Sequence, residues 1–420
     1  MKLLFVHERL GAFGGAETNL QLAARELKSR GHSLSLLHGS LTGPGEKIWR
    51  EIFRPCVALG VSGNGAVRSA LADISPDLIY VHKMSDLAVI EELVASGIPL
   101  VRMVHDHDLY CMRSYKYRVF SRAICTRPAS WRCIFPCGAF LARNRGEGLP
   151  VKWISYSAKR KEIQLNQRFQ RMIVASNYMK NELLQNGIAE EQIRIHPPVP
   201  EQARDTLAGE RVPAATVPAQ SRSGSAEGLV KSDRNLVLYV GQIIRGKGVD
   251  VLMESLARVK VPFEALIVGD GHHRSGCEKL SQRLGLADRV HFPGFVSREE
   301  LGKYFRAANL MVLSSVWPEP FGAVGLEGMR YGLPVVAFDA GGIREWLINN
   351  ETGFLVPWMD RAQFAARVEE LLLNKTLARQ MGERGARVVA ERFEFSDYIT
   401  ALENTFTQVV SEAEEEKVHA

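Results

Sequence analysis

The chain has 420 residues, of which 46% are hydrophobic and 24% are charged, a composition that excludes a wholly disordered protein and accommodates two or three globular domains. No stretch reaches the roughly 18 consecutive apolar residues of a membrane-spanning helix, and the first residues, MKLLFVHE, run into a strand pattern instead of a cleavable signal. We therefore expect a cytoplasmic protein.

The net charge of +6 is unevenly distributed, because residues 105–161 carry 12 Lys and Arg against 3 Asp and Glu. Such a basic segment favours an anionic partner: an anionic membrane surface on the inner face of the cytoplasmic membrane, a diphosphate-linked acceptor or nucleic acid, of which we rank nucleic acid last. A solvated basic loop without a partner is the alternative.

Apolar runs alternate with amphipathic segments along the chain, a pattern typical of parallel sheets covered by helices on both faces. The runs expected to form strands are 3–6, 34–38, 78–82, 100–105 and 172–176 in the first half, and 236–241, 264–269, 289–292, 310–315, 334–338 and 353–356 in the second. The sequence therefore predicts an α/β fold with two doubly wound, Rossmann-like domains.

Residues 200–233 are rich in Ala, Ser, Gly and Pro and lack hydrophobic periodicity, so we expect a mobile linker there. The expected parts are domain 1–199 with a Cys-rich basic insertion at 106–150, the linker 200–233, domain 234–392, and a helix with an acidic, frayed end at 393–420. Open sheets bind ligands at the carboxyl ends of their strands, so two facing sheets would form a site in the cleft between them.

A glycine-rich loop, GAFGGAE, follows the first expected strand and opens a helix. Gly14 and Gly15 would let backbone amides approach an anion, and Glu17 comes next on the helix. A purely structural turn is the alternative. The loop does not match the G-x-G-x-x-G pattern of dinucleotide sites.

His105 ends another expected strand, where an imidazole could hydrogen-bond a substrate, and a strand-end histidine with a structural partner is the alternative. Asp106, His107 and Asp108 follow and are candidates to activate an acceptor hydroxyl. They also form the chain's one Asp-x-Asp sequence, so composition alone leaves a metal role open.

Four of the six cysteines lie in the expected insertion: Cys111, Cys125, Cys133 and Cys137. Only the last pair has the spacing of metal ligands, so a structural zinc or iron-sulfur site, free thiols and disulfides all stay open. Aromatic residues interleave with the arginines here, as suits a membrane interface, a stacked sugar acceptor or a self-packed insertion.

The second domain opens with YVGQIIRGKG, where Gly241 ends the strand and Arg245 and Lys247 precede the next helix. These two cations are suited to stabilising a diphosphate. Further on, Gly269 ends a strand where a nucleotide could pass, and Phe295 and Val296 could offer apolar and amide contacts to a base.

Residues 314–332 read SSVWPEPFGAVGLEGMRYG, with Glu319 and Glu327 eight positions apart. Pro318 and Pro320 forbid a helix before Glu319, Pro320 can sit in a first helical turn, and Gly332 can end the helix. Glu319 should therefore precede a helix that contains Glu327. Amides near Phe321 and Gly322, with room left by Gly325, would suit a diphosphate.

These motifs resemble the retaining glycosyltransferases of family four, the glycogen-synthase-like group, whose signature is two glutamates separated by seven residues. The resemblance covers about residues 1–20, 98–110 and 234–395. It implies a GT-B fold in which the last helix crosses back onto the amino-terminal domain. It also implies a sugar transfer from a nucleoside-diphosphate sugar that needs no metal for catalysis.

The resemblance also implies residue roles. Glu319 would contact the donor sugar and Glu327 its ribose, Lys247 would bind phosphate, and His105 would lie beside the sugar. Gly14, Gly15 and Glu17 match a Gly-Gly-x-Glu motif that faces the donor phosphates and the acceptor. The arginine usual after the strand glycine is Gln242 here, and Arg245 is the candidate to supply its charge.

The sequence thus predicts a retaining hexosyltransferase-like enzyme that acts on a glycan or lipid-linked acceptor, as in the synthesis of a bacterial cell-surface polysaccharide or lipopolysaccharide. Two rivals stay open: a nucleotide-sugar epimerase of the same architecture, and a non-catalytic protein that binds sugar nucleotides or nucleic acid.

Overall fold

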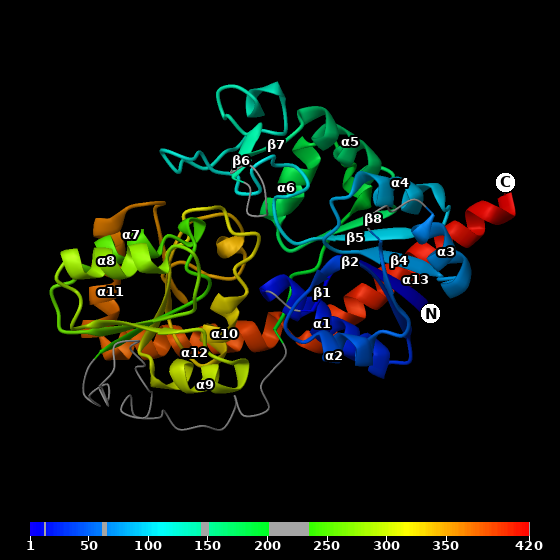
Figure 1. Ribbon diagram of the computed structural model, residues 1–420. Helices are drawn as coiled ribbons and strands as arrows, with labels where there is room; N and C mark the ends of the chain where they lie inside the picture. The colour runs from blue at the N-terminus through cyan, green and yellow to red at the C-terminus, as the bar shows by residue number, and fades with distance from the viewer. Residues whose placement is uncertain (12–13, 61–64, 144–150, 201–234, 420) are drawn as a thin grey trace. The chain divides into compact units, whose positions relative to one another are not determined.

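The computed structural model of the protein describes residues 1–11, 14–60, 65–143, 151–200 and 235–419 (Figure 1). The chain divides into two compact units. Unit 1 comprises Met1–Arg118, Cys125–Val199 and Phe395–Ala420, and unit 2 comprises Val119–Ile124 and Pro200–Glu394. Apart from Pro200, the expected linker lies outside the described residues, as do residues 144–150 of the expected insertion.

Unit 1 is built on a parallel sheet of seven strands in the order β3-β2-β1-β4-β5-β8-β9. The strands are β1 (Lys2–Leu10), β2 (Ser33–Thr42), β3 (Cys56–Ala58), β4 (Leu78–Val81), β5 (Leu100–Val104), β8 (Arg171–Val174) and β9 (Ile193–Ile195). The strand order reverses between β1 and β4, which is the switch point of a doubly wound sheet. The three-residue edge strands β3 and β9 add to the strands that the sequence predicts.

Helices connect these strands: α1 (Gly15–Ser29), α2 (Glu46–Ile52), α3 (Ala66–Ile74), α4 (Leu87–Ala95), α5 (Tyr156–Asn166), α6 (Asn177–Gln185) and the short η2 (Glu190–Gln192). Short polar side chains start three of them. Asp86, Ser155 and Ser176 accept hydrogen bonds from backbone amides in the first turns of α4, α5 and α6. These caps satisfy amides that have no partner within the helix.

A small lobe of unit 1 projects beside α5 and α6 (Figure 1). It contains η1 (Trp131–Cys133) and an antiparallel pair, β6 (Leu141–Arg143) and β7 (Val151–Trp153). It falls mostly within the expected insertion, but Val119–Ile124 of that insertion group with unit 2.

Unit 2 has a parallel sheet of six strands in the order β12-β11-β10-β13-β14-β15. The strands are β10 (Leu236–Val240), β11 (Glu264–Val268), β12 (Val290–Gly294), β13 (Leu310–Leu313), β14 (Val335–Phe338) and β15 (Gly353–Val356). The other elements are η4 (Arg245–Lys247), α7 (Val249–Leu256), α8 (Arg274–Arg283), α9 (Arg298–Ala307), α10 (Val324–Arg330), η5 (Gly342–Glu345), α11 (Arg361–Leu373) and α12 (Lys375–Arg392). The predicted α/β fold with two doubly wound sheets is confirmed.

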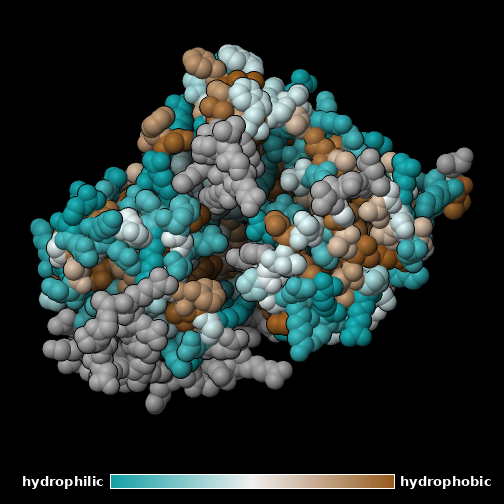
Figure 2. Space-filling view, in the orientation of Figure 1, coloured by the Kyte–Doolittle hydropathy of each residue, from teal (hydrophilic) through white to brown (hydrophobic). Residues whose placement is uncertain are grey.

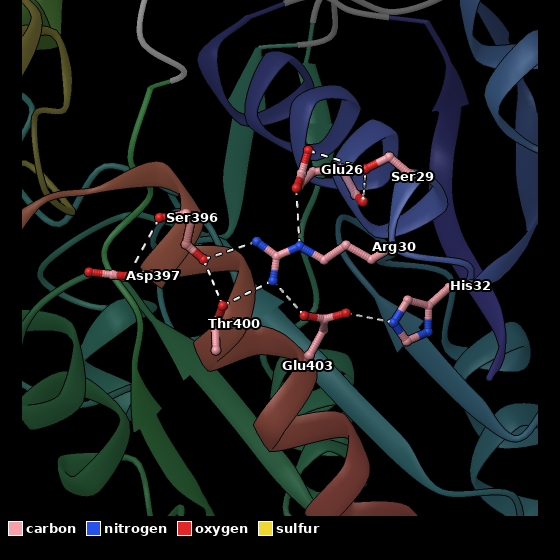
Figure 3. Close-up of polar contacts among 8 residues, drawn as sticks. All are labelled: Glu26, Ser29, Arg30, His32, Ser396, Asp397, Thr400 and Glu403. Carbon is pink, nitrogen blue, oxygen red and sulfur yellow. Dashed lines mark hydrogen bonds and ion pairs between the residues drawn. The ribbon is translucent and has the colours of Figure 1, made fainter.

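The final helix, α13 (Phe395–His419), belongs to unit 1 although it follows unit 2 in the chain. Glu403 of this helix lies 2.6 Å from an Arg30 nitrogen and 2.8 Å from His32 Nε2 (Figure 3). The ring of Phe406 meets that of Tyr80 edge-on, with 4.9 Å between the centroids. The predicted return of the last helix is therefore confirmed. α13 continues through the acidic residues to His419, and fraying of this end stays a prediction.

None of the described helices combines the length and the apolar character that crossing a membrane requires.

Candidate functional site

In unit 2, the loop that follows β10 is fixed to the chain that follows β13. The carbonyl of Gly246 accepts hydrogen bonds from the amides of Val316 (2.9 Å) and Trp317 (3.1 Å), and Ser314 Oγ donates to the carbonyl of Lys247 (3.0 Å). Gly248 has a positive φ of +65°, and a Cβ there would overlap the Ser314 carbonyl oxygen. Only glycine allows this approach, which sets the position of Lys247.

Lys247 and Glu319 form an ion pair, with 2.6 Å between Nζ and Oε1. Ser315 Oγ donates to the same carboxylate oxygen, and Nζ also lies 5.2 Å from the centroid of the Trp317 ring. Glu319 is only 2% exposed. Burial alone would raise the pKa of Glu319, but the charge and hydrogen bond of Lys247, with hydrogen bonds from Ser315 and Trp317, lower it. The carboxylate therefore stays ionised in the interior.

The backbone of Glu319 is held as well. Its amide donates to the carbonyl of Ala340 (3.2 Å), and the amide of Gly342 donates to its carbonyl (2.7 Å). These bonds join it to the DAGG turn after β14, where Gly341 has a φ of +67°. The loops that follow three neighbouring strands, β10, β13 and β14, thus hold the Lys247–Glu319 ion pair in place.

Glu327 lies in α10 and Glu319 lies before it, as the spacing predicts. Glu327 is half-buried, and burial raises its pKa although Arg298 and Arg330 act in the opposite direction. The prediction that Pro320 sits in the first helical turn is wrong, because α10 begins only at Val324.

Glycines and Phe321 near α10 have packing roles. Phe321 is buried, and its carbonyl accepts a hydrogen bond from the Trp346 indole (2.7 Å). A Cβ on Gly325 would overlap the Trp346 ring. The prediction that this glycine leaves room for a diphosphate is therefore wrong, because the space is taken by a tryptophan. At Gly322, which has a φ of +82°, a Cβ would make only ordinary contacts.

The glycines at the strand ends of unit 2 also accommodate backbone. A Cβ on Gly269 would overlap the carbonyl oxygen of Gly241, and one on Gly271 would overlap that of Ile243. The ends of β10 and β11 can therefore lie unusually close. Arg245 opens the η4 turn that Lys247 closes and is half-buried.

Phe295, directly after β12, has a side chain that is 83% exposed, and the neighbouring Val296 is half-buried. An uncovered ring at a strand end can stack on a flat ligand.

In unit 1, four neighbouring strands each end near a histidine: His38 on β2, His7 on β1, His82 after β4 and His105 after β5. His7 and His38 are register partners, and His82 Nδ1 lies 2.8 Å from His105 Nε2 with the two rings stacked at 5.1 Å. Burial lowers the pKa of His105 to about 3 against the opposing charge of Asp106, and it also lowers that of His82. Both imidazoles are therefore neutral near pH 7.

Charged residues surround this row. Glu17 is buried, 3.9 Å from His7 Nε2. Lys83 Nζ lies 2.9 Å from Asp106 and 3.5 Å from Asp108. Burial would raise the pKa of Asp106, but Lys83 lowers it, whereas burial and the charge of Asp106 raise the pKa of Asp108 to about 6. The sequence alone did not single out His7, His38, His82 or Lys83 as site residues.

The structure does not place His107 where an acceptor can touch it. Its side chain is fully buried, and Nδ1 lies 2.8 Å from the Tyr110 hydroxyl. Gly14 directly precedes α1, and its carbonyl accepts hydrogen bonds from Thr18, while a Cβ on Gly15 would meet no atom within 4 Å. Residues 12 and 13 of this loop lie outside the described residues.

None of the four cysteines of the insertion forms a disulfide in the structure. Burial raises the pKa of the Cys133 thiol, and a backbone hydrogen bond at Ser130 acts in the opposite direction. Within the described part of the chain, no group of three or more His, Cys, Asp or Glu is arranged to hold a metal ion. A metal at these cysteines stays a prediction.

Sequence models of two protein families match the chain: Glycosyltransferase Family 4 over residues 13–199 and Glycosyl transferases group 1 over residues 223–388. The alpha-D-kanosaminyltransferase of Streptomyces kanamyceticus is 36% identical over 167 residues, which make up 39% of this chain and 43% of that protein. The lipopolysaccharide core biosynthesis glycosyltransferase LpsE of Rhizobium meliloti is 30% identical over 162 residues, 39% of this chain and 46% of that protein. The chain thus spans less than half the length of these curated relatives.

The fold is similar to that of Anabaena Alr3699/HepE, solved in complex with UDP-glucose, with a TM-score of 0.72 and 20% identity over 97% of this chain and 100% of that chain. This likeness shows that the fold is GT-B. The chain therefore belongs to the family-four glycosyltransferases, with a Glycosyltransferase Family 4 domain in its amino-terminal half and a Glycosyl transferases group 1 domain in its carboxyl-terminal half.

Proposed function

We propose that this glycosyltransferase moves a hexose or related sugar from a nucleoside diphosphate to a hydroxyl of a glycan or lipid-linked acceptor, with retention of the anomeric configuration. The observation that carries the proposal is the buried Lys247–Glu319 pair, placed by two loops at the carboxyl ends of β10 and β13. The name of LpsE supports a cell-surface glycan, and the UDP-glucose complex of Alr3699/HepE supports a nucleotide-sugar donor.

Lys247 and Arg245 would stabilise the negative charge that develops on the departing diphosphate. The Lys247 side chain keeps 22% of its surface exposed, so its ammonium can reach a ligand while it stays paired with Glu319. Because these cations belong to the chain itself, we propose that catalysis needs no metal.

Glu319 would hold hydroxyls of the donor sugar and not attack it. Its Oε1 already accepts hydrogen bonds from Lys247 and Ser315, which reduces its nucleophilicity. The acceptor hydroxyl would therefore attack on the face that the diphosphate leaves and give its proton to the departing phosphate oxygen. Retention follows without a covalent intermediate.

We assign the neutral His105 of unit 1 to hydrogen bonding with the transferred sugar or the acceptor. Because its pKa is about 3, it cannot act as a cationic acid near pH 7. Glu17 and Asp106 remain our candidates for the acceptor side, with Glu327 assigned to the donor ribose and Phe295 to the base.

The test is incubation with a panel of nucleotide sugars, with and without glycan and lipid-linked acceptors, while released diphosphate is measured. We expect release that depends on one donor and an acceptor, and an anomeric proton coupling in the product that matches the donor's. Isomerised donor without acceptor would identify an epimerase. Tight nucleotide binding without any turnover would identify a non-catalytic binding protein.

A further inference from the structure

Exposed apolar side chains gather in one short part of the chain. Among the described residues, seven of the twelve exposed large apolar side chains lie between Tyr115 and Trp153. Six of these seven belong to unit 1: Tyr115 (39% exposed), Trp131 (62%), Ile134 (38%), Phe135 (74%), Leu141 (43%) and Trp153 (73%). In Figure 2, brown and white residues lie among teal ones at the top of the view, above the grey atoms. An apolar concentration of this kind on a soluble fold marks an interaction surface.

The same stretch is strongly basic. Residues 115–153 contain eight Lys and Arg and one acidic residue, Glu147. Arg127 and Arg132 are exposed, and the Arg132 guanidinium lies over the Trp131 ring, 5.6 Å from its centroid. We call residues 125–143 and 151–153 the basic-aromatic lobe.

The lobe is held firmly to the rest of unit 1. Lys116, 2% exposed, pairs with Glu182 of α6 at 2.7 Å and donates to the carbonyl of Arg127 at 2.6 Å. The amide of Ala129 donates to the Asn186 side chain (2.9 Å). Burying a lysine costs free energy that its two partners offset, so the side chains at the outer surface of the lobe project from a built scaffold.

Several of the exposed apolar side chains are neighbours in pairs. Leu141 and Trp153 are register partners across β6 and β7, so their side chains share one face of the hairpin. Phe135 lies in the same turn as Trp131, since its amide donates to the Trp131 carbonyl (3.3 Å). Aromatic rings next to arginines are typical of the headgroup level of a bilayer, where the rings enter the acyl boundary and the guanidinium groups meet phosphates.

We propose that the basic-aromatic lobe is a docking surface for an anionic lipid bilayer. Its cationic surface would repel a second copy of itself, which disfavours self-association through the lobe. Aliphatic tips such as Ile134 and Leu141 enter hydrocarbon but give no stacking surface for a base, which disfavours single-stranded nucleic acid. This docking is a property of unit 1 and does not depend on the proposed transfer chemistry.

The tryptophans allow a direct test on the unaltered protein. The chain has six, of which only Trp131 and Trp153 are exposed, and the other four are buried or half-buried. We expect vesicles of phosphatidylcholine with phosphatidylglycerol, carrying brominated acyl chains, to quench tryptophan fluorescence. Raising the salt concentration should reverse the quenching. Absence of quenching with these vesicles would overturn the proposal.

Variants then locate the surface by vesicle sedimentation. The triple variant Trp131→Ser, Phe135→Ser, Trp153→Ser and the double variant Arg127→Gln, Arg132→Gln should each bind anionic vesicles at least roughly ten-fold more weakly. Leu373→Ser with Val418→Ser is the matched control, because these side chains are 69% and 81% exposed elsewhere, and it should bind normally. Circular dichroism and the thermal midpoint verify folding in each case.

Three results would contradict this assignment: equal loss in the control, equal binding to phosphatidylcholine alone, or a wild-type dimer that the triple variant abolishes. If the lobe bound single-stranded RNA more strongly than anionic vesicles, its partner would be nucleic acid and not a bilayer.

Discussion

The charge state of Glu319 depends on Lys247. A carboxylate that is 2% exposed would take up a proton without a nearby cation, and the ammonium at 2.6 Å prevents this. The exposed remainder of Lys247 reaches solvent, so the same cation can stabilise the carboxylate and meet a ligand. Stability and proposed activity therefore overlap at this pair, and single substitutions alone cannot separate them.

A double-variant cycle does separate them. Lys247→Met should lower the free energy of unfolding by about 3 kcal/mol, because it leaves a buried charge unpaired, and Glu319→Gln in the same chain should restore most of that loss. Transfer should stay at least about 100-fold reduced in the double variant. Denaturation and diphosphate release measure the two effects, with exposed Lys279→Met as the control. Wild-type turnover by the double variant would contradict the assigned role.

Two glycines with similar backbone angles provide a second test at this scale. Gly248 and Gly332 have φ values of +65° and +70°, but only at Gly248 would a Cβ collide with backbone, at Ser314. Gly332→Ala should cost about 1 kcal/mol for the left-handed conformation, and Gly248→Ala about 3 kcal/mol or more because overlap adds to it. Urea denaturation measures the free energy of unfolding of both variants. If both lose the same amount, the loop at Gly248 moves to accommodate the added methyl group.

At the level of strands and helices, the histidine row shows what sequence can and cannot provide. The runs LLFVH, LSLLH, LIYVH and LVRMVH each end in histidine, and this signal is visible in the sequence. Only the strand order β2-β1-β4-β5 makes His38, His7, His82 and His105 neighbours, and that order is a tertiary property. Single-residue reasoning therefore found His105 and missed the other three.

The row should make unit 1 sensitive to acid. The pKa values of His7 and His105 are lowered to about 4 and about 3, whereas the unfolded chain titrates near 6.5. Protons therefore bind the unfolded state preferentially, and stability is lost as the pH falls below about 6.5 toward these values. After correction for the intrinsic exchange rate, which itself falls with pH, the protection of the β1 and β4 amides should decrease as the pH falls from about 7 to about 5, above the range of ordinary carboxyl groups.

His82→Phe is the informative variant here, because a phenyl ring keeps the packing on Phe5 and Tyr80 and cannot bind a proton. The protection of the same amides should change less over this pH range in the variant than in the wild type. Parallel pH profiles would exclude His82 as a cause of the acid sensitivity.

Other elements were predictable to different degrees. The long apolar strands stand out by composition, whereas β3 and β9 have three residues each and no periodicity to detect. The eight-residue interval correctly put Glu327 in a helix and Glu319 before it. The start of α10 was misplaced because the chain from Glu319 pairs with the turn after β14, which no local preference of Pro320 reveals.

At the scale of the whole molecule, the two units do not follow one another along the chain, because unit 1 contains both the first and the last segment. Apart from the short segment Val119–Ile124, unit 2 is formed by Pro200–Glu394, whereas unit 1 is completed only by α13. The contacts that hold α13 are polar at the surface, at Arg30–Glu403 and Arg171–Glu412 (2.7 Å), and apolar beneath, at Tyr80–Phe406.

Weakening these contacts should therefore affect unit 1 alone. Glu403→Gln with Glu412→Gln should cost about 1 kcal/mol for each ion pair at most, because both pairs are partly exposed. Hydrogen exchange should accelerate in α13 and α1 and stay unchanged in unit 2. Glu414→Gln with Glu416→Gln, both on the exposed end of α13, is the control with equal charge change. If hydrogen exchange in unit 2 accelerated as much as in α13, the assignment of α13 to unit 1 alone would be contradicted.

The late position of α13 also sets an order for biosynthesis. A ribosome delivers all the strands of the amino-terminal sheet first, yet the helix that covers Tyr80 and binds Arg30 emerges only after the unit 2 segment Pro200–Glu394. The nascent amino-terminal half must therefore wait, with part of its core uncovered, until the rest has been translated. The carboxyl-terminal sheet, continuous in sequence, is the first to reach its complete structure.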